Sequence, residues 1–143
     1  IIRKGNTTMV MRLVDGDFPD YTRVLPVSNT KTAIINCSNF LHTLKRISIL
    51  SSDKFKGIRL ELQNGNMEIS ANNPELGEAR ESMEVKYEGE NIAMRFNAKY
   101  FIDVLSVIEE SDVELNLKDE LSPAILKPLN SNEFLSVIMP MHL

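Results

Sequence analysis

The hydrophobic patterns of the sequence predict an α+β domain that contains two copies of one βαβββ unit. Apolar residues first alternate as in a strand, then recur at helical spacing, then alternate again through three further segments. The same order of patterns begins again near Ile92. At 143 residues, 43% of them hydrophobic and 25% charged, the chain can form one domain with a sizeable core. We therefore expect two helices packed against antiparallel sheets.

The segment before the first unit is predicted to be a strand followed by a connector. Apolar and polar residues alternate from Thr7 to Val14, and Asp15, Gly16 and Asp17 then interrupt the pattern. Because Ile1 is not an initiator residue and a strand begins almost at once, we expect a fragment of a longer protein.

The first unit is predicted to comprise a strand over Ala33 to Asn36, a helix ending near Ser51, and three further strands. Ser38 or Asn39 is the expected N-cap of the helix. The helix has an apolar stripe formed by Phe40, Leu41, Leu44 and Ile47. The strands are expected at 57–63, 67–71 and 78–87, with a type I′ turn at Asn64-Gly65 between the first two.

The second unit is predicted to repeat this order from Ile92, with Asn97 as the N-cap of a helix over Ala98 to Ile108. Aligning Cys37 with Asn97 matches the apolar stripe of the first helix to Tyr100, Phe101, Val104 and Val107. Strands are expected at 113–117, 124–129 and 134–138. The exposed helix faces are predicted to hold His42, Lys45, Arg46 and Ile49 on the first helix, and Lys99, Asp103 and Ser106 on the second.

Composition argues against several classes of protein. The net charge of −4 counts against a domain that holds nucleic acid mainly by neutralising phosphates. Because no run approaches the roughly 20 apolar residues of a membrane helix, we expect a cytosolic protein. One cysteine, Cys37, and two histidines leave almost no material for a zinc or haem site, so no metal or cofactor is expected.

Two alternative functions have weaker support. A small hydrolase would need a Ser-His-Asp set or a carboxylate pair such as Asp15 and Asp17, but neither His42 nor His142 lies in a recognisable nucleophile or metal motif. Close acidic residues in a connector are commonly turn formers. A stand-alone nucleic-acid-binding domain would need clustered basic and aromatic residues, whereas the aromatic residues here mostly fall in the core stripes. Tight binding to short linear DNA would favour this second alternative.

Spaced motifs in a specific order point to a family. The most specific one runs from Val14 to Pro26, VDGDFPDYTRVLP, and the others are 54–60, 71–75, 96–97 and 137–143. Together they resemble the bacterial DNA sliding clamp, the beta subunit of DNA polymerase III, over nearly the whole chain. The resemblance implies a DNA-clamp fold. Residues 1–25 would then be the last strand of the middle domain with a connector, and residues 26–143 the third, C-terminal domain.

The resemblance also implies a function without catalysis. Two protomers of the family close head to tail into a ring that encircles duplex DNA, independent of its sequence, and slides along it as a polymerase processivity factor. DNA polymerase, the clamp loader and repair proteins dock into a groove through short linear motifs. A cytoplasmic, nucleoid-associated location follows from this role.

The docking groove has a predicted set of residues, carried over from the family. They are Pro19, Arg23, Val24, Asn97, Tyr100, Leu121, Pro123, Val137, Met139, Pro140 and Met141, with His142 and Leu143 at the rim. Flexible methionine side chains suit a groove that serves several partners. His142 departs from the basic residue that is common at this position in the family, so its role in holding an acidic group is in doubt.

Two further surfaces are expected. Lys45, Arg46, Lys54 and Lys56 are predicted to face the DNA, with ordinary surface solvation as the alternative. Ile49 and Leu50, with Arg80, Glu81 and Glu84 on the strand from Glu78 to Lys86, are predicted to form the ring interface, in which that strand pairs edge to edge with the neighbouring protomer. The same charges would equally protect an exposed sheet edge from unwanted pairing.

Overall fold

The computed structural model describes residues 1–12, 16, 20, 22, 25, 30–51, 57–131 and 134–141. Within this part of the chain there are two helices and ten strands. The first βαβββ unit consists of β3 (Lys31–Asn36), α1 (Cys37–Ser48), β4 (Gly57–Gln63), β5 (Asn66–Asn73) and β6 (Gly77–Glu84). The second unit consists of β7 (Ile92–Asn97), α2 (Ala98–Leu105), β8 (Asp112–Leu117), β9 (Ala124–Pro128) and β10 (Ser136–Ile138). The predicted duplication is confirmed.

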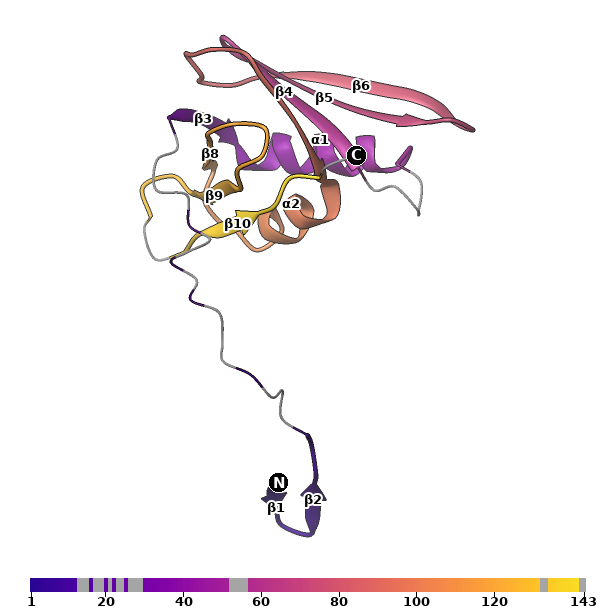
Figure 1. The fold of residues 1–143 in the computed structure, drawn as a ribbon, viewed down its shortest axis with the longest axis vertical. Helices are drawn as coiled ribbons and strands as arrows, with labels where there is room; N and C mark the ends of the chain where they lie inside the picture. The colour runs from indigo at the N-terminus through magenta and orange to yellow at the C-terminus, as the bar shows by residue number, and fades with distance from the viewer. Residues whose placement is uncertain are drawn as a thin grey trace.

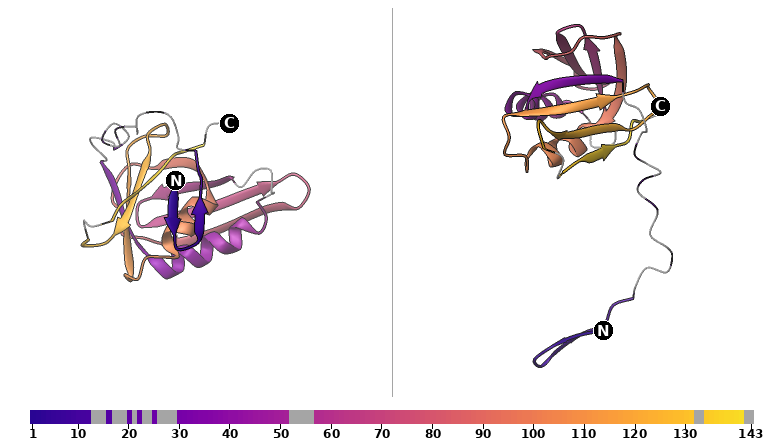
Figure 2. Two further views of the ribbon diagram at one scale, coloured as in Figure 1. Left: turned by 90° about the horizontal axis from the view of Figure 1, so that it is seen from below. Right: turned by 90° about the vertical axis from the view of Figure 1, so that its left-hand side faces the viewer.

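The two units exchange their first strands. One antiparallel sheet has the order β6-β5-β4-β7 and the other has the order β10-β9-β8-β3, so β7 joins the strands of the first unit and β3 joins those of the second. The right-hand view of Figure 2 shows the second of these sheets face on. Two backbone hydrogen bonds between Ile34 and Lys86, each 3.0 Å long, also link β3 to the chain that follows β6.

The helices lie side by side and share an aromatic core. The rings of Phe40 on α1 and Phe101 on α2 are 5.6 Å apart, and Phe96 on β7 meets Phe101 edge to face at 5.1 Å. All three are fully buried. In Figure 1, α1 lies beneath the β6-β5-β4-β7 sheet, which it contacts through β5 and β6, and α2 lies next to β10.

The N-cap of α1 is Asn36, and the predictions of Ser38 or Asn39 are wrong. The side-chain oxygen of Asn36 accepts a hydrogen bond of 3.0 Å from the Asn39 backbone N–H, whereas Asn97 caps α2 as predicted and accepts from Lys99 at 3.0 Å. Because Asn36 and Asn97 hold equivalent positions, the predicted alignment of the two helices was shifted by one residue.

The shift explains which helix residues are buried. Phe40 is equivalent to Phe101, and both are fully buried, while Tyr100 is 52% exposed and Val107 is 70% exposed. Placing Tyr100 and Val107 in the core stripe was therefore wrong. The result leaves the Tyr100 side chain at the surface.

Several boundaries differ from the prediction. Both helices end about one turn early, α1 at Ser48 and α2 at Leu105, and β6 ends at Glu84. The β4–β5 turn lies at Asn64-Gly65 as expected, but only Gly65 has a positive φ, at 74°. A type I′ turn needs positive φ at both central residues, so this assignment was wrong.

The N-terminal residues form a separate hairpin of β1 (Ile2–Lys4) and β2 (Thr7–Met9). Figure 1 and the right-hand view of Figure 2 show it apart from the two larger sheets. Its strand residues are all exposed, whereas the sequence predicted a half-buried strand from Thr7. No helix in the described ranges is long and apolar enough to cross a membrane.

Candidate functional site

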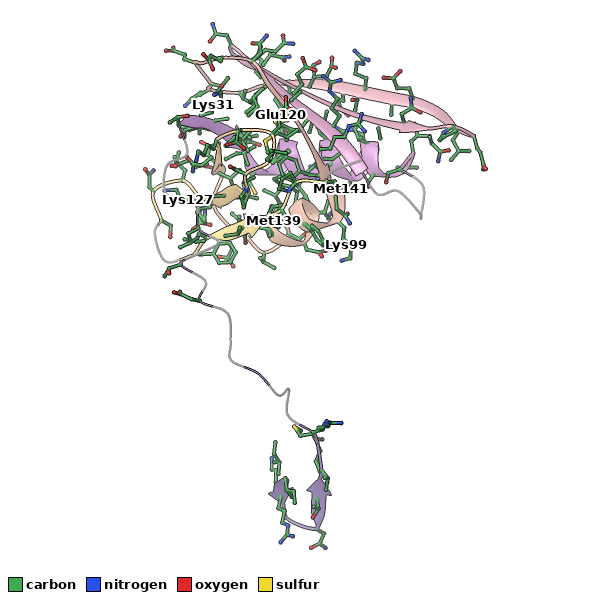
Figure 3. All side chains as sticks on the ribbon, in the orientation of Figure 1. Lys31, Lys99, Glu120, Lys127, Met139 and Met141 are labelled. Carbon is green, nitrogen blue, oxygen red and sulfur yellow. The ribbon has the colours of Figure 1, made fainter. Side chains whose placement is uncertain are left out.

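The C-terminal tail joins the two sheets. Its strand β10 pairs with β9 at the edge of one sheet, with Ile138 opposite Ala124. Three residues later, the Met141 backbone N–H donates a hydrogen bond of 2.7 Å to the Arg95 carbonyl on β7, the edge strand of the other sheet. Between these anchors Pro140 is buried, and the Met139 side chain is 56% exposed (Figure 3). The tail therefore presents side chains from a backbone that is held at both ends.

The loop between β8 and β9 contributes Leu121, whose side chain is 70% exposed. Asp119 accepts hydrogen bonds from the backbone N–H groups of Leu121 (3.0 Å) and Ser122 (2.7 Å) and from the Ser122 hydroxyl (2.9 Å). These bonds, the one from the hydroxyl above all, lower the pKa of the Asp119 carboxyl. These hydrogen bonds fix the backbone of the turn, and the Leu121 side chain points away from the core.

The structure brings together part of the predicted groove. Leu121 and Met141 line one cavity of about 440 Å³ at the junction of the two sheets. Tyr100 is exposed on α2, which contacts β10, while Pro123 and Val137 are half-buried. Asn97 uses its side-chain oxygen to cap α2. Other predicted groove residues lie outside the described residues: Pro19, Arg23, Val24, His142 and Leu143.

Two predicted surfaces meet at one ion pair. Arg46 on α1, predicted to face DNA, donates from Nε to Glu81 Oε2 at 3.0 Å, and a second bond joins its Nη2 to Glu81 Oε1. The hydroxyl of the buried Thr43 also donates to Glu81 Oε1, at 3.1 Å. The Arg46 hydrogen bond is the main reason that the pKa of Glu81 is lowered, and Glu81 in turn raises the pKa of Arg46. The ion pair joins α1 to β6. In this structure the Arg46 guanidinium and the Glu81 carboxylate are therefore bound to each other.

Of the remaining basic residues of the predicted DNA-facing surface, the structure describes Lys45. Lys45 and His42 are exposed on α1, and Ile49 is exposed at its C-cap. Lys54 and Lys56 lie outside the described residues. The exposed face of α2 is balanced in charge, because Lys99 forms an ion pair with Asp103 one turn further on.

The predicted ring interface lies along an edge strand. β6 is the last strand of its sheet, and Arg80 on it contacts Glu68 at 3.2 Å and Glu78 at 2.9 Å. Glu84 is exposed and Leu50 is half-buried, while Ile49, the C-cap of α1, is 78% exposed. This edge therefore combines paired charges with a neighbouring exposed apolar side chain.

Sequence reasoning missed one apolar residue near this edge. Leu76, in the turn between β5 and β6, is 66% exposed. In Figure 1 this turn and the C-terminal end of α1 lie on the same side of the molecule. The signal was present in the sequence, since Leu76 is an apolar residue in a turn beside Pro74 and Gly77.

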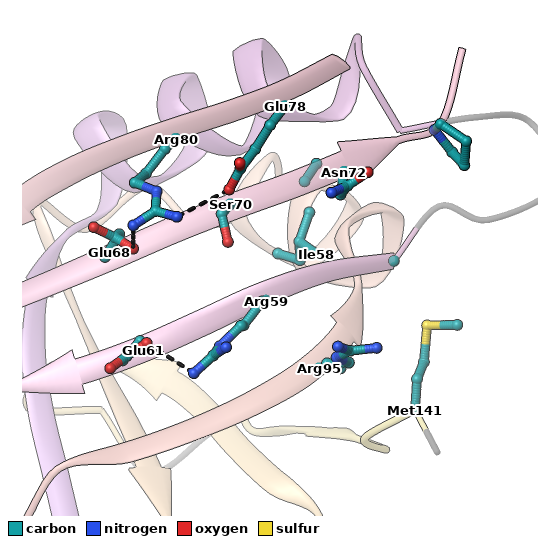
Figure 4. A pocket seen from close by; sticks show the side chains of 13 residues that line it. Ile58, Arg59, Glu61, Glu68, Ser70, Asn72, Glu78, Arg80, Arg95 and Met141 are labelled. Carbon is teal, nitrogen blue, oxygen red and sulfur yellow. Dashed lines mark hydrogen bonds and ion pairs between the residues drawn. The ribbon is translucent and has the colours of Figure 1, made fainter. Parts of the chain in front are cut away.

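The outer face of the β6-β5-β4-β7 sheet carries a second, larger cavity of about 490 Å³ (Figure 4). Its lining is charged and includes the ion pair between Arg59 and Glu61, at 3.0 Å, and the contacts of Arg80. Met141 lies at its margin and lines this cavity as well as the 440 Å³ one. Across the described residues, no group of three or more His, Cys, Asp or Glu side chains could hold a metal ion.

The duplicated unit, with its exchanged first strands and adjacent helices, is the fold of a DNA-clamp domain. The chain belongs to the family described as DNA polymerase III beta subunit, C-terminal domain, which it matches over residues 22–142. The predicted family and fold class are thus confirmed.

Known relatives are similar over most of this chain. The "Beta sliding clamp" of Proteus mirabilis is 42% identical over 139 residues, which make up 97% of this chain and 38% of the relative. The crystal structure of the DNA polymerase III subunit beta from Pseudomonas aeruginosa has a TM-score of 0.88 at 42% identity, covering 92% of this chain and 36% of that one. Another Pseudomonas aeruginosa sliding clamp, bound to griselimycin, has a TM-score of 0.87 at the same identity and coverage. The chain spans about 38% of the length of the curated relatives it matches.

Proposed function

We propose that this chain is the C-terminal third of a ring-forming DNA polymerase processivity factor, with no catalytic role of its own. The ring encircles duplex DNA in the cytoplasm, at the nucleoid, and slides along it. Polymerase, clamp loader and repair proteins dock on this domain through short linear motifs. Membership of the beta subunit family supports the proposal, as do the relatives named as sliding clamps.

The anchored C-terminal tail is the observation that carries the docking role. Three exposed apolar side chains lie on or near the tail. Met139 belongs to it, Tyr100 lies on α2, which contacts β10, and Leu121 lines a cavity together with Met141. Methionine is flexible and polarisable, so Met139 and Met141 can repack around different apolar anchors. Because Pro140 and the Met141 hydrogen bond already hold the backbone, little conformational entropy is lost when a partner binds.

A fluorescence-polarisation titration tests this role. The probe is a labelled clamp-binding pentapeptide of the Gln-Leu-x-Leu-Phe type, and we expect saturable binding to this chain. Leu121→Ala and Met139→Ala should each weaken binding several-fold, because an apolar contact contributes about 1 kcal/mol or more when buried in an interface. Val107→Ala is the matched control, since Val107 is as exposed as Leu121 and lies outside the groove.

Griselimycin provides a second probe, since a relative with 42% identity binds it. We expect it to bind this chain and to displace the labelled peptide. Equal affinities in wild type, Leu121→Ala and Met139→Ala would refute a groove at the tail.

The proposed DNA contacts are few and weak. A ring that slides needs no tight grip on phosphates, since strong counterion-releasing contacts would slow its movement, and the net charge of −4 is compatible with topological binding. Lys45 is available on α1 for transient contacts, with Lys54 and Lys56 next in the chain. Arg46 would have to leave Glu81 to join them.

The proposed ring interface is the edge of β6 with Ile49, Leu50 and Leu76 beside it. A free strand edge pairs readily with a strand of a second chain, and exposed apolar side chains supply the surface that such pairing buries. Glu81 and Arg80 already have partners in this structure, so closure of the ring would add a neighbour's charges to existing pairs.

A further inference from the structure

Two arginines face each other on the outer surface of the sheet. Arg59 on β4 and Arg95 on β7 are direct cross-strand partners, and both side chains are exposed. Like charges placed directly opposite each other destabilise a sheet. Such a pair at a sheet edge therefore needs either an internal counter-charge or an external one.

Among the residues that the structure describes, a counter-charge is present for Arg59 but not for Arg95. Arg59 forms an ion pair with Glu61 at 3.0 Å. No ion pair or side-chain hydrogen bond joins Arg95 to another residue of the described chain, and its backbone carbonyl accepts the bond from Met141. Figure 4 shows the Arg95 side chain between Arg59 and Met141. Within the described part of the chain, the positive charge of Arg95 is thus unpaired beside Met141.

This charge lies in the cavity that contains part of the proposed groove. Arg59 and Arg95 line the 440 Å³ cavity together with Leu121 and Met141. The remaining ionisable group in its lining is Glu120, which is exposed and forms no ion pair with either arginine. The groove therefore continues from an apolar region into a basic one.

We propose that Arg95, supported by Arg59, binds an acidic side chain that flanks the apolar anchors of a docking peptide. This rests on the proposed docking function and specifies which partners the groove prefers. A guanidinium binds a carboxylate through two parallel hydrogen bonds. The adjacent Leu121 and Met141 select a ligand that combines a carboxylate with apolar side chains, as a peptide does. Lys45 and Arg46, two of the residues proposed to face DNA, lie by contrast on α1.

The test compares extended forms of the same pentapeptide in the polarisation assay. Two Asp, two Ser or two Lys residues are added before the motif in one series and after it in another. In one of the two series, the Asp form should bind about two- to fivefold more tightly than the Ser form at low salt, as for a solvent-exposed ion pair. This preference is diagnostic because the chain carries a net charge of −4, which on its own disfavours acidic peptides. Added salt should reduce the gain.

Arg95 variants locate the effect. The gain should disappear in Arg95→Gln, persist in part in Arg95→Lys, and change sign in Arg95→Glu, which should prefer the Lys form. Arg3→Gln, which removes one exposed positive charge from the β1–β2 hairpin, should keep the full gain. Arg3→Gln should bind the unextended pentapeptide as the wild type does, and in each Arg95 variant the gain is measured as the ratio between its own affinities for the Asp and Ser forms.

The outcomes separate the two proposals. If the unextended pentapeptide does not bind the wild type, the docking function itself fails. If it binds but the Asp and Ser forms bind equally well in both series, the acidic-flank inference is overturned while the groove stands. A gain that survives Arg95→Gln also overturns it.

Discussion

Glu81 connects a helix to an exposed sheet edge through its side chain alone. Its carboxylate accepts hydrogen bonds from Arg46 and from the buried hydroxyl of Thr43. Bonds to the ionised form stabilise it, which explains why the pKa of Glu81 lies below its ordinary value of 4.5 despite partial burial.

The substitution Glu81→Gln should lower the free energy of unfolding at pH 7. A carboxyl whose pKa is lowered by folding contributes stability that is fully present above the unfolded pKa, near 4.5, and is lost as the pH falls through the folded value. The difference between wild type and variant should therefore shrink below about pH 4.5 in urea titrations. Glu84→Gln, an exposed change on the same strand, serves as the control. A difference that stayed constant down to pH 3 would show that the ion pair is not its source.

At the residue scale, the sequence indicates which charged residues lie at the surface, but not which residues they pair with. Arg46 and Glu81 were assigned to different surfaces because they are 35 residues apart, and only the packing of α1 on β6 brings them together. Similarly, the pairing of Arg59 with Arg95 depends on the register between β4 and β7. Alternation shows that each side chain points outward, but it contains no information on the opposite residue.

The N-caps are the features that set the helix register. Asn36 caps α1 through Asn39 and also donates a hydrogen bond of 3.0 Å to the Ser111 carbonyl. Asn36→Ala should reduce the free energy of unfolding by about 1 kcal/mol or more. Asn39→Ala should cost about 0.5 kcal/mol or less, because that residue contributes its backbone N–H to the cap. Equal losses for the two variants in urea denaturation would contradict this assignment.

The corrected alignment of the two helices has its own test. Phe101 is fully buried against Phe40 and Phe96, so Phe101→Ala should cost about 3–5 kcal/mol. Tyr100→Ala should cost about 0.5 kcal/mol or less, since its ring is half exposed. Chemical denaturation measures both. A large loss for Tyr100→Ala would restore the original alignment, in which Tyr100 and Phe40 are equivalent.

At the element scale, the order of strands and helices within the two units could be predicted, as could the hairpin of β4 and β5. The exchange of strands between the sheets and several element ends could not. Periods of two and of 3.6 residues identify each element from local sequence. Ser38 and Asn39 are good capping residues, so propensity alone placed the N-cap of α1 too late. The exchange of β3 and β7 between sheets is a long-range result of packing, because either strand satisfies the same alternating pattern in either sheet.

For the whole molecule, the exchanged strands and the tail have a common effect. β3 and β7 bind each unit to the other's sheet, and the tail connects β10 to β7 through Met141. Strands and hydrogen bonds from both units therefore stabilise the junction of the two sheets beside Leu121. A rigid junction suits the proposed docking site. The predicted division between residues 25 and 26 stays a prediction.

The central claim is that partner peptides bind at the tail, and chemical-shift mapping tests it most directly. The ¹⁵N-labelled chain is titrated with the unlabelled pentapeptide. We expect the largest amide shifts at Tyr100, Leu121, Met139 and Met141, with little change at Lys45 or in the β1–β2 hairpin. Shifts concentrated on the exposed faces of α1 and α2, with none at the tail, would contradict the account.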